Sequence, residues 1–278
     1  MRIAEWINLT YFICLTALAC VQTLPATRRR RITAFAILGI GLTLAGRFSE
    51  TILGPEGSFT LRNWLPAVTI LVAYWQAGQF YLEPSDRLQK WLQSTDDALG
   101  TALRVLEPLM RSRPLAAYLE VVYLLAYPFI PLALAVLVFS GYSRQADYFW
   151  SVVLLSSYAC YGMLPFAPSL PPRLEPASGV DARKAWKEKH RALNLWVLGW
   201  LGIRANTFPS GHVAATLAAS LVLLERLPLV GSIFLWVAVS IAVSTVVRRY
   251  HFFLDALLGA LLALVFRILL GGIEFGEP

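Results

Sequence analysis

The chain has 278 residues, of which 57% are hydrophobic and only 15% are charged, and its formal net charge is +7. Its mean hydropathy is +0.60. A soluble domain has a charged fraction nearer to about 25%, so this composition excludes an ordinary water-soluble fold. The positive residues stand between apolar blocks, which indicates membrane topology and anionic lipid, and not nucleic acid, as the reason for the charge.

Apolar blocks of roughly 20 residues, the length that a helix needs to cross a bilayer, recur along the chain. They predict an all-α, multi-pass transmembrane bundle of about eight helices. We interpret the first block as a membrane helix and not as a signal peptide, because its positive cluster follows it. The predicted helices are residues 3–24, 33–53, 64–83, 115–140, 146–165, 211–227, 229–248 and 251–271.

Two stretches between these blocks do not resemble membrane spans. In the first, Leu88, Trp91 and Leu92 recur with an amphipathic period, and Asp96 lies on the polar face, which predicts a helix at the membrane interface. The second, residues 166–208, has a proline-rich start, a basic middle and a Trp-rich end. The predicted division is 1–83 (N-terminal transmembrane helices), 84–114 (amphipathic interfacial segment), 115–271 (catalytic core) and 272–278 (short tail).

The distribution of positive charge predicts an orientation. Most of the 24 Lys and Arg residues fall in the loops after the first, third, fifth and seventh predicted helices. These loops share one face of the membrane if eight helices cross it. Cytoplasmic loops are rich in Lys and Arg, so the count places this face in the cytoplasm and both termini outside.

A histidine and a carboxylate stand at the start of the last predicted helix. His251 and Asp255 are four residues apart, a spacing that brings two side chains together. A carboxylate that accepts a hydrogen bond from one ring nitrogen fixes the tautomer of the histidine and leaves the other nitrogen free to attack. Arg248 and Arg249 directly precede the pair and suit charge-assisted bonds to phosphate. The same cluster also suits a helix end that meets lipid headgroups.

A second group begins the helix predicted at residue 211. Ser210 is a good N-cap, Gly211 permits close approach of a ligand, and His212 falls in the first turn. Backbone amides at a helix start bind anions. A plain helix cap with an interfacial histidine is the alternative interpretation. In the preceding loop, two prolines stiffen the backbone before Arg173.

Together these residues resemble the type 2 phosphatidic-acid phosphatase superfamily, whose pattern is K-x6-R-P, then P-S-G-H, then S-R-x5-H-x3-D. The second motif matches at residues 209–212, and Ser244, His251 and Asp255 match the third. Three positions depart from the pattern. The first motif has Phe166 for its Lys and Leu174 for its Pro, and the third has Thr245 for its Arg. The divergent motifs resemble the branch of inositol phosphorylceramide synthases and their bacterial relatives.

The resemblance implies a six-helix core over roughly residues 115–271, to which the first two helices are an addition. It implies a metal-independent phosphatase with no cofactor and a phosphohistidine intermediate. His251 would be the nucleophile, Asp255 its orienter and His212 the acid and base. The phosphate would be held by Arg173, Ser210, Gly211, Arg249 and Arg248.

The expected substrate is a lipid phosphate or diphosphate in a bacterial plasma membrane, with no nucleic-acid partner. Transfer to an alcohol acceptor, as in phosphorylceramide synthesis, is the main alternative to hydrolysis. An inactive lipid-binding or transport protein is the other. The resemblance also implies a site on the outer face of the membrane, in conflict with the charge count.

Overall fold

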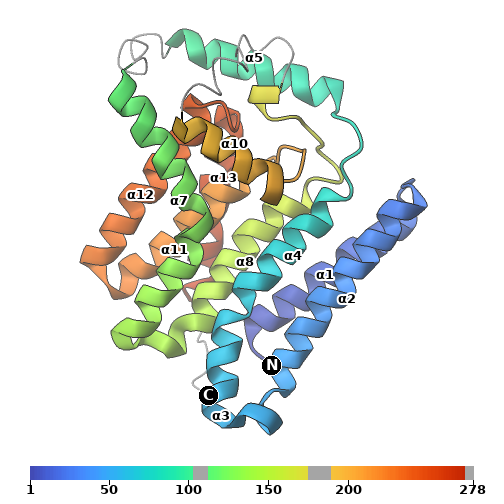
Figure 1. Ribbon diagram of the computed structural model, residues 1–278, viewed down its shortest axis with the longest axis vertical. Coiled ribbons are helices and arrows are strands. Elements are labelled where there is room, and N and C mark those ends of the chain that lie inside the picture. Colours follow the sequence, from blue (N-terminus) through green and yellow to red (C-terminus); the bar gives the residue numbers. More distant parts are fainter. Residues whose placement is uncertain (103–111, 175–188, 273–278) are drawn as a thin grey trace.

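The computed structural model describes residues 1–102, 112–174 and 189–272 (Figure 1). Within these ranges the chain is helical apart from its loops and one isolated β-bridge, so the predicted all-α membrane bundle is confirmed. Five helical segments are long and apolar enough to cross a membrane. They are α1 (Ile3–Val21), α2 (Ala26–Phe48), the continuous segment Arg113–Gly162, α12 (Pro228–Val247) and α13 (Phe253–Leu270).

The segment Arg113–Gly162 contains two helices, α7 (Arg113–Leu137) and α8 (Ala146–Gly162). A π turn, η2 (Val138–Tyr142), and a 3₁₀ turn, η3 (Ser143–Gln145), join them. Gly141 in this connection has a φ of 90°, a conformation that glycine adopts without a Cβ clash. The chain therefore reverses here, descending along α7 and rising along α8 in Figure 1.

The N-terminal region differs from the prediction in its helix boundaries. α2 begins at Ala26 and not at residue 33, so Arg28 to Arg31 lie in its first turns and not in a loop. Arginine is a good helix former. The predicted helix begins later because its boundary is set by the apolar residues alone, which excludes charged arginines. α3 (Glu50–Trp64) covers the predicted loop 54–63 and the end of the predicted helix 33–53, and it is broken at Gly54. α4 (Pro66–Gly78) is shorter than the predicted helix 64–83.

α11 (Gly211–Arg226) is the central helix and packs against α7, α8, α12 and α13. Small residues make up most of its buried face, including Ala214, Ala215, Ala218 and Ala219. Small side chains let membrane helices approach closely. A Cβ added to Gly259 of α13 would lie 2.6 Å from the carbonyl oxygen of Ser210. The starts of α11 and α13 are therefore held side by side.

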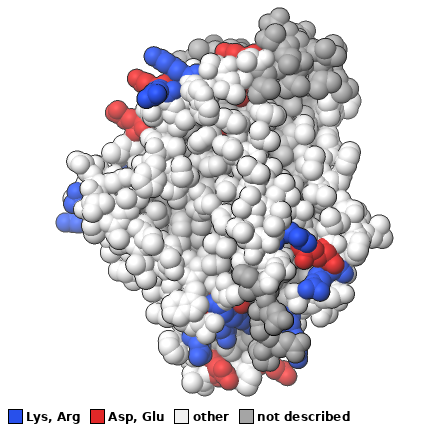
Figure 2. Space-filling view, turned by 180° about the vertical axis from the view of Figure 1, so that it is seen from behind, with Lys and Arg blue, Asp and Glu red and all other residues white. Residues whose placement is uncertain are grey.

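α5 (Asp86–Ala102) lies across the end of the bundle opposite to the N-terminus, with α10 (Lys189–Leu201) close to it in the view of Figure 1. Figure 2 shows the molecule from behind the view of Figure 1. The described charged side chains lie mostly near the edges of this face and leave a broad uncharged surface between them, as a lipid-facing surface requires. Arg104, on the polar face of the predicted interfacial helix, lies outside the described ranges, as do Arg183, Lys184 and Lys187 in the basic middle of residues 166–208.

Candidate active site

Three loops meet at the end of the bundle that α5 covers. The loop after α8 leads into the 3₁₀ turn η4 (Pro172–Leu174), and its Ser169 forms an antiparallel bridge with Asn206 in the loop before α11. The Arg173 amide donates to the Arg249 carbonyl at 3.0 Å. The Ser210 amide donates to the Asp255 carbonyl at 2.9 Å. The backbone thus joins the three sequence motifs into one site.

His251 and Asp255 meet in the turn that begins α13. His251 Nδ1 lies 3.2 Å from Asp255 Oδ2, and the Asp255 side chain is fully buried. The same Oδ2 accepts from the Phe252 amide at 3.0 Å and from Asn206 Nδ2 at 2.7 Å. Because the Asp255 carboxylate accepts a hydrogen bond from Nδ1, the proton of the neutral His251 ring stays on Nδ1. The lone pair on Nε2 is then available. Asn206 stands outside the motifs and was missed from the sequence.

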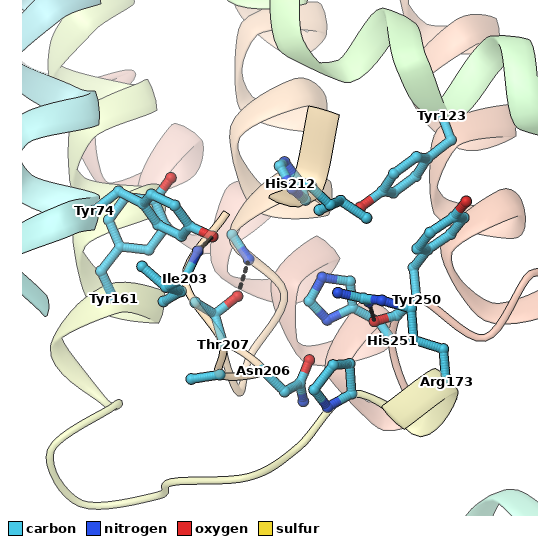
Figure 3. A pocket seen from close by; sticks show the side chains of 14 residues that line it. Tyr74, Tyr123, Tyr161, Arg173, Ile203, Asn206, Thr207, His212, Tyr250 and His251 are labelled. Carbon is cyan, nitrogen blue, oxygen red and sulfur yellow. Dashed lines mark hydrogen bonds between the residues drawn. The ribbon is translucent and has the colours of Figure 1, made fainter. Parts of the chain in front are cut away.

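His212 stands opposite His251 across one small cavity (Figure 3). The two ring centroids are 6.2 Å apart, and the planes meet at 79°. The His212 ring contacts both Tyr123 and Tyr127 of α7, at centroid distances of 5.9 and 5.7 Å. Aromatic edges fix its orientation in the first turn of α11. The predicted pair of histidines therefore shares one cavity.

The start of α11 is organised as a helix cap. Ser210 is fully buried, and its Oγ accepts from the Val213 amide at 3.5 Å. The Gly211 amide donates to Thr207 Oγ1 at 3.3 Å. A Cβ on Gly211 would lie 2.4 Å from a ring carbon of Tyr161, so only glycine fits. Gly211 and Thr207 line the cavity, whereas Ser210 supports the helix start from behind.

The three predicted arginines have three different environments. Arg173 lines the cavity, where its Nη1 donates to the Tyr250 carbonyl at 3.3 Å and its guanidinium lies 5.4 Å from the centroid of the Tyr250 ring. Arg248 Nε lies 2.6 Å from Glu120 Oε1. Arg249 has a φ of 60°, uncommon for a residue with a Cβ. Of the three, only Arg173 is among the residues that line the cavity.

Glu120 of α7 is the centre of a buried polar cluster that the sequence motifs do not contain. Its carboxylate accepts from Tyr250 Oη, Arg248 Nε and Asn194 Nδ2, each at 2.6 Å, and from Arg191 Nη1 at 3.2 Å. The Tyr250 ring stacks on Tyr123 with centroids 3.8 Å apart. A single carboxylate inside an apolar membrane helix was the available signal, because such residues are costly unless paired.

α5 contacts all three motif loops. Gln89 forms two hydrogen bonds with the Leu170 backbone, at 3.1 and 2.9 Å, and Trp91 meets the Phe208 ring at 6.3 Å. Asp96 Oδ1 accepts from the Phe253 amide at 2.9 Å and so caps α13. Burial raises the pKa of the Asp96 carboxyl to about 6. The sequence placed Asp96 on the polar face of an interfacial helix, and the structure places it beside the turn that begins α13.

An apolar cavity of about 170 Å³ adjoins His212. It lies between α4, α7, α8 and α11 and shares Tyr74, Tyr161, Gly211 and His212 with the smaller cavity. Aliphatic side chains make up most of its remaining wall: Ala67, Ile70, Leu71, Ala126, Ile130 and Ala215. The polar side chain of His212 thus borders a space suited to hydrocarbon.

The chain is similar in sequence to known proteins. The family model of the PAP2 superfamily matches residues 90–269. Over 66 residues the chain is 41% identical to a PA-phosphatase related-family protein of Dictyostelium discoideum. That alignment covers 24% of this chain and only 12% of the relative, so the chain spans a small part of the relative's length. No solved structure matches the chain.

Proposed function

Because the matched residues 90–269 make up more than half of it, this chain belongs to the PAP2 superfamily, and we propose that it removes phosphate from a membrane lipid through a phosphohistidine on His251. One observation carries the proposal: His251 is oriented by a fully buried Asp255 and faces His212 across one cavity. The match supports phosphatase or phosphotransferase chemistry, and the name of the Dictyostelium relative refers to a phosphatase.

The proposed first step is attack of His251 Nε2 on phosphorus. The nitrogen–phosphorus bond forms as the bond to the lipid oxygen breaks, and protonated His212 gives its proton to that oxygen. Asp255 stabilises the positive charge that His251 acquires. In the second step His212 takes a proton from water, the water oxygen bonds to phosphorus, and the nitrogen–phosphorus bond breaks. Inorganic phosphate is then released.

Arg173 is the residue that we propose holds the phosphate oxygens, since it lines the cavity beside His251. The amides at the start of α11 add the positive end of a helix dipole. Ser210 keeps that start in place as its cap. Arg248 contributes indirectly, because its partner Glu120 also binds the hydroxyl of Tyr250. Arg249 acts through its backbone carbonyl, which accepts from the Arg173 amide.

An amphiphilic substrate follows from the two adjoining cavities. The phosphate would occupy the histidine cavity, and part of an acyl or prenyl chain would enter the apolar cavity beside His212. Hydrophobic contact then contributes to binding in proportion to the apolar area that is covered. A water-soluble phosphate ester would lack this contribution and would bind more weakly.

Transfer to an alcohol is a second candidate, favoured by the motif departures at Phe166, Leu174 and Thr245 that resemble the phosphorylceramide synthase branch. The test uses purified protein in detergent with lipid monophosphates, with and without an added alcohol. Release of inorganic phosphate without the alcohol supports hydrolysis. Consumption of the lipid only with the alcohol supports transfer. If neither reaction is observed, lipid binding or transport is the remaining candidate function.

The membrane face of the site is tested by labelling. Ser94 is exposed on α5, and Glu56 is exposed on α3. These helices lie at opposite ends of the bundle in Figure 1. In a chain with the exposed Cys14 and Cys20 replaced by Ser, a membrane-impermeant maleimide applied to intact cells should label only one of the variants Ser94→Cys and Glu56→Cys. Labelling at residue 94 supports an outward site, and labelling at residue 56 supports the cytoplasmic site that the charge count predicts.

A further inference from the structure

A broad arginine-lined groove adjoins the catalytic cavity. It runs between α2, α4, α10 and η4, and it shares Arg173, Leu198 and Ile203 with the histidine cavity. A ligand that reaches from one to the other would stay in contact with the protein, because the same three residues border both spaces. The groove is therefore an extension of the proposed phosphate site.

Four arginines line this groove: Arg28, Arg31, Arg173 and Arg204. None of the described lining residues is Asp or Glu. Arg28 Nη1 lies 3.3 Å from Gln79 Oε1, which holds its side chain against the end of α4. A concentration of guanidinium groups without carboxylates suits a phosphate group, which arginine binds through directed hydrogen bonds.

The arrangement of α2 selects two of its four consecutive arginines for the groove. Arg28, Arg31 and Phe35 are separated by three and four residues and share one helical face, which lines the groove. Arg29 and Arg30 are not among the residues that line it. The four arginines are equivalent for membrane topology, but only two are placed for contact with a ligand.

Aromatic and aliphatic side chains line the rest of the groove. They include Trp75 and Trp200, residues of the kind found at the level of lipid headgroups, together with Leu82 and Leu195. Trp75 is held in place by a hydrogen bond from its Nε1 to the Leu201 carbonyl, at 2.9 Å. A phosphate group bound here would accordingly be carried by a lipid.

We propose that this groove binds a second phosphate-bearing group beside the phosphate that reacts. The inference rests on the proposed function, since it defines the groove relative to the reacting phosphate. The group has two possible sources: the second phosphate of a lipid diphosphate substrate, or the headgroup of a neighbouring anionic phospholipid. The chemistry is the same for both, and the two are distinguished by experiment.

The test compares the groove variant Arg28→Ala/Arg31→Ala with the control Arg29→Ala/Arg30→Ala, which removes equal charge from the same helix end. Each is assayed on a prenyl monophosphate and a prenyl diphosphate of equal chain length. Vesicles of phosphatidylcholine are used alone and with added phosphatidylglycerol. A tenfold change corresponds to about 1.4 kcal/mol, within reach of charge-assisted hydrogen bonds.

If the second phosphate belongs to the substrate, the groove variant raises KM for the diphosphate about tenfold more than for the monophosphate in phosphatidylcholine alone. If it belongs to a neighbouring lipid, phosphatidylglycerol stimulates the wild type severalfold and the groove variant much less, with either substrate. The control should match the wild type in both respects. Equal behaviour of groove variant and control overturns the proposal.

Failure of the proposed function has a different signature. Wild-type protein would then release no phosphate from either substrate under any condition. Binding to the groove would still be measured by the rise in thermal unfolding temperature on addition of pyrophosphate, or of phosphatidylglycerol to the detergent. A rise for wild type and control that the groove variant lacks supports the groove alone. Equal rises in all three proteins, or none, overturn it.

Discussion

His251 and Arg248 lie three residues apart in the sequence, yet they belong to different parts of the site. His251 lines the cavity that it shares with His212, whereas Arg248 pairs with Glu120 outside it. The partner of His251 is four residues away, and the partner of Arg248 is 128 residues away. Local spacing therefore determines the histidine side of the site, and long-range packing determines the arginine side.

The largest expected effect tests the histidine side. His251→Ala should abolish phosphate release, because among the described residues of the cavity wall no other group is oriented as a nucleophile by a buried carboxylate. His212→Ala should remove most of the activity by removing the acid and base. Inorganic phosphate release from a lipid phosphate measures both. His190, which is exposed, provides the control His190→Ala. Wild-type turnover by His251→Ala would refute the assignment.

The arginine side is tested by a pair of substitutions. Arg173→Ala should lower kcat/KM about 10²- to 10³-fold, the range for loss of one donor to developing charge. Arg249→Ala should have a much smaller effect, because its role here is a backbone carbonyl that alanine retains. Steady-state kinetics on one lipid phosphate gives both values. A larger loss from Arg249→Ala would transfer the phosphate-holding role to that residue.

Arg248 should matter more for stability than for chemistry. Arg248→Ala removes one of two arginines from the buried Glu120, and breaking a buried ion pair costs about 3 kcal/mol of unfolding free energy. Thermal unfolding in detergent should show a clear decrease. The control Arg226→Ala removes an arginine whose hydrogen bond to Gln145 is exposed, and it should change little. A selective rise in KM without loss of stability would contradict this role.

The smallest effect concerns Asp96 and pH. Burial is the main cause that raises the pKa of Asp96 from 3.8 to about 6, and the negative charges of Asp255 and Asp97 raise it further. The hydrogen bond from the Phe253 amide and the positive charge of Arg249 lower this pKa and offset part of the rise. The folded protein thus binds a proton more tightly than the unfolded chain, so stability should fall as pH rises from about 4 to about 6.

Asp96→Asn keeps an acceptor for the Phe253 amide and removes the titration. Its unfolding temperature should therefore depend less on pH over this interval and should equal or exceed that of the wild type at pH 7. Asp96→Ala also loses the cap, at a cost of about 1 kcal/mol. Unfolding curves at pH 4, 5, 6 and 7 provide the measurement. An unchanged pH dependence in Asp96→Asn would exclude this carboxyl as the cause.

Much of the fold could be predicted, because apolar blocks of spanning length are local signals. The start of α11 could be predicted from Ser210 as its N-cap, and the start of α13 from the His251–Asp255 spacing. The roles of Asn206, Glu120 and Asp96 could not be predicted, because each depends on which distant loop or helix packs against it. Asp96 shows the limit clearly: amphipathic spacing placed it toward solvent, but the docking of α5 turned it to the start of α13.

The part of the cavity walls that α4 contributes has a practical consequence for chimeric proteins. Tyr74 lines both cavities, and its hydroxyl accepts from the Ile203 amide at 3.0 Å. Residues 66–78 precede the region that matches the superfamily. Exchanging that region alone between relatives would leave the recipient's own α4 facing a foreign loop and a foreign chain cavity. Grafts intended to transfer substrate preference should carry α4 with the catalytic helices.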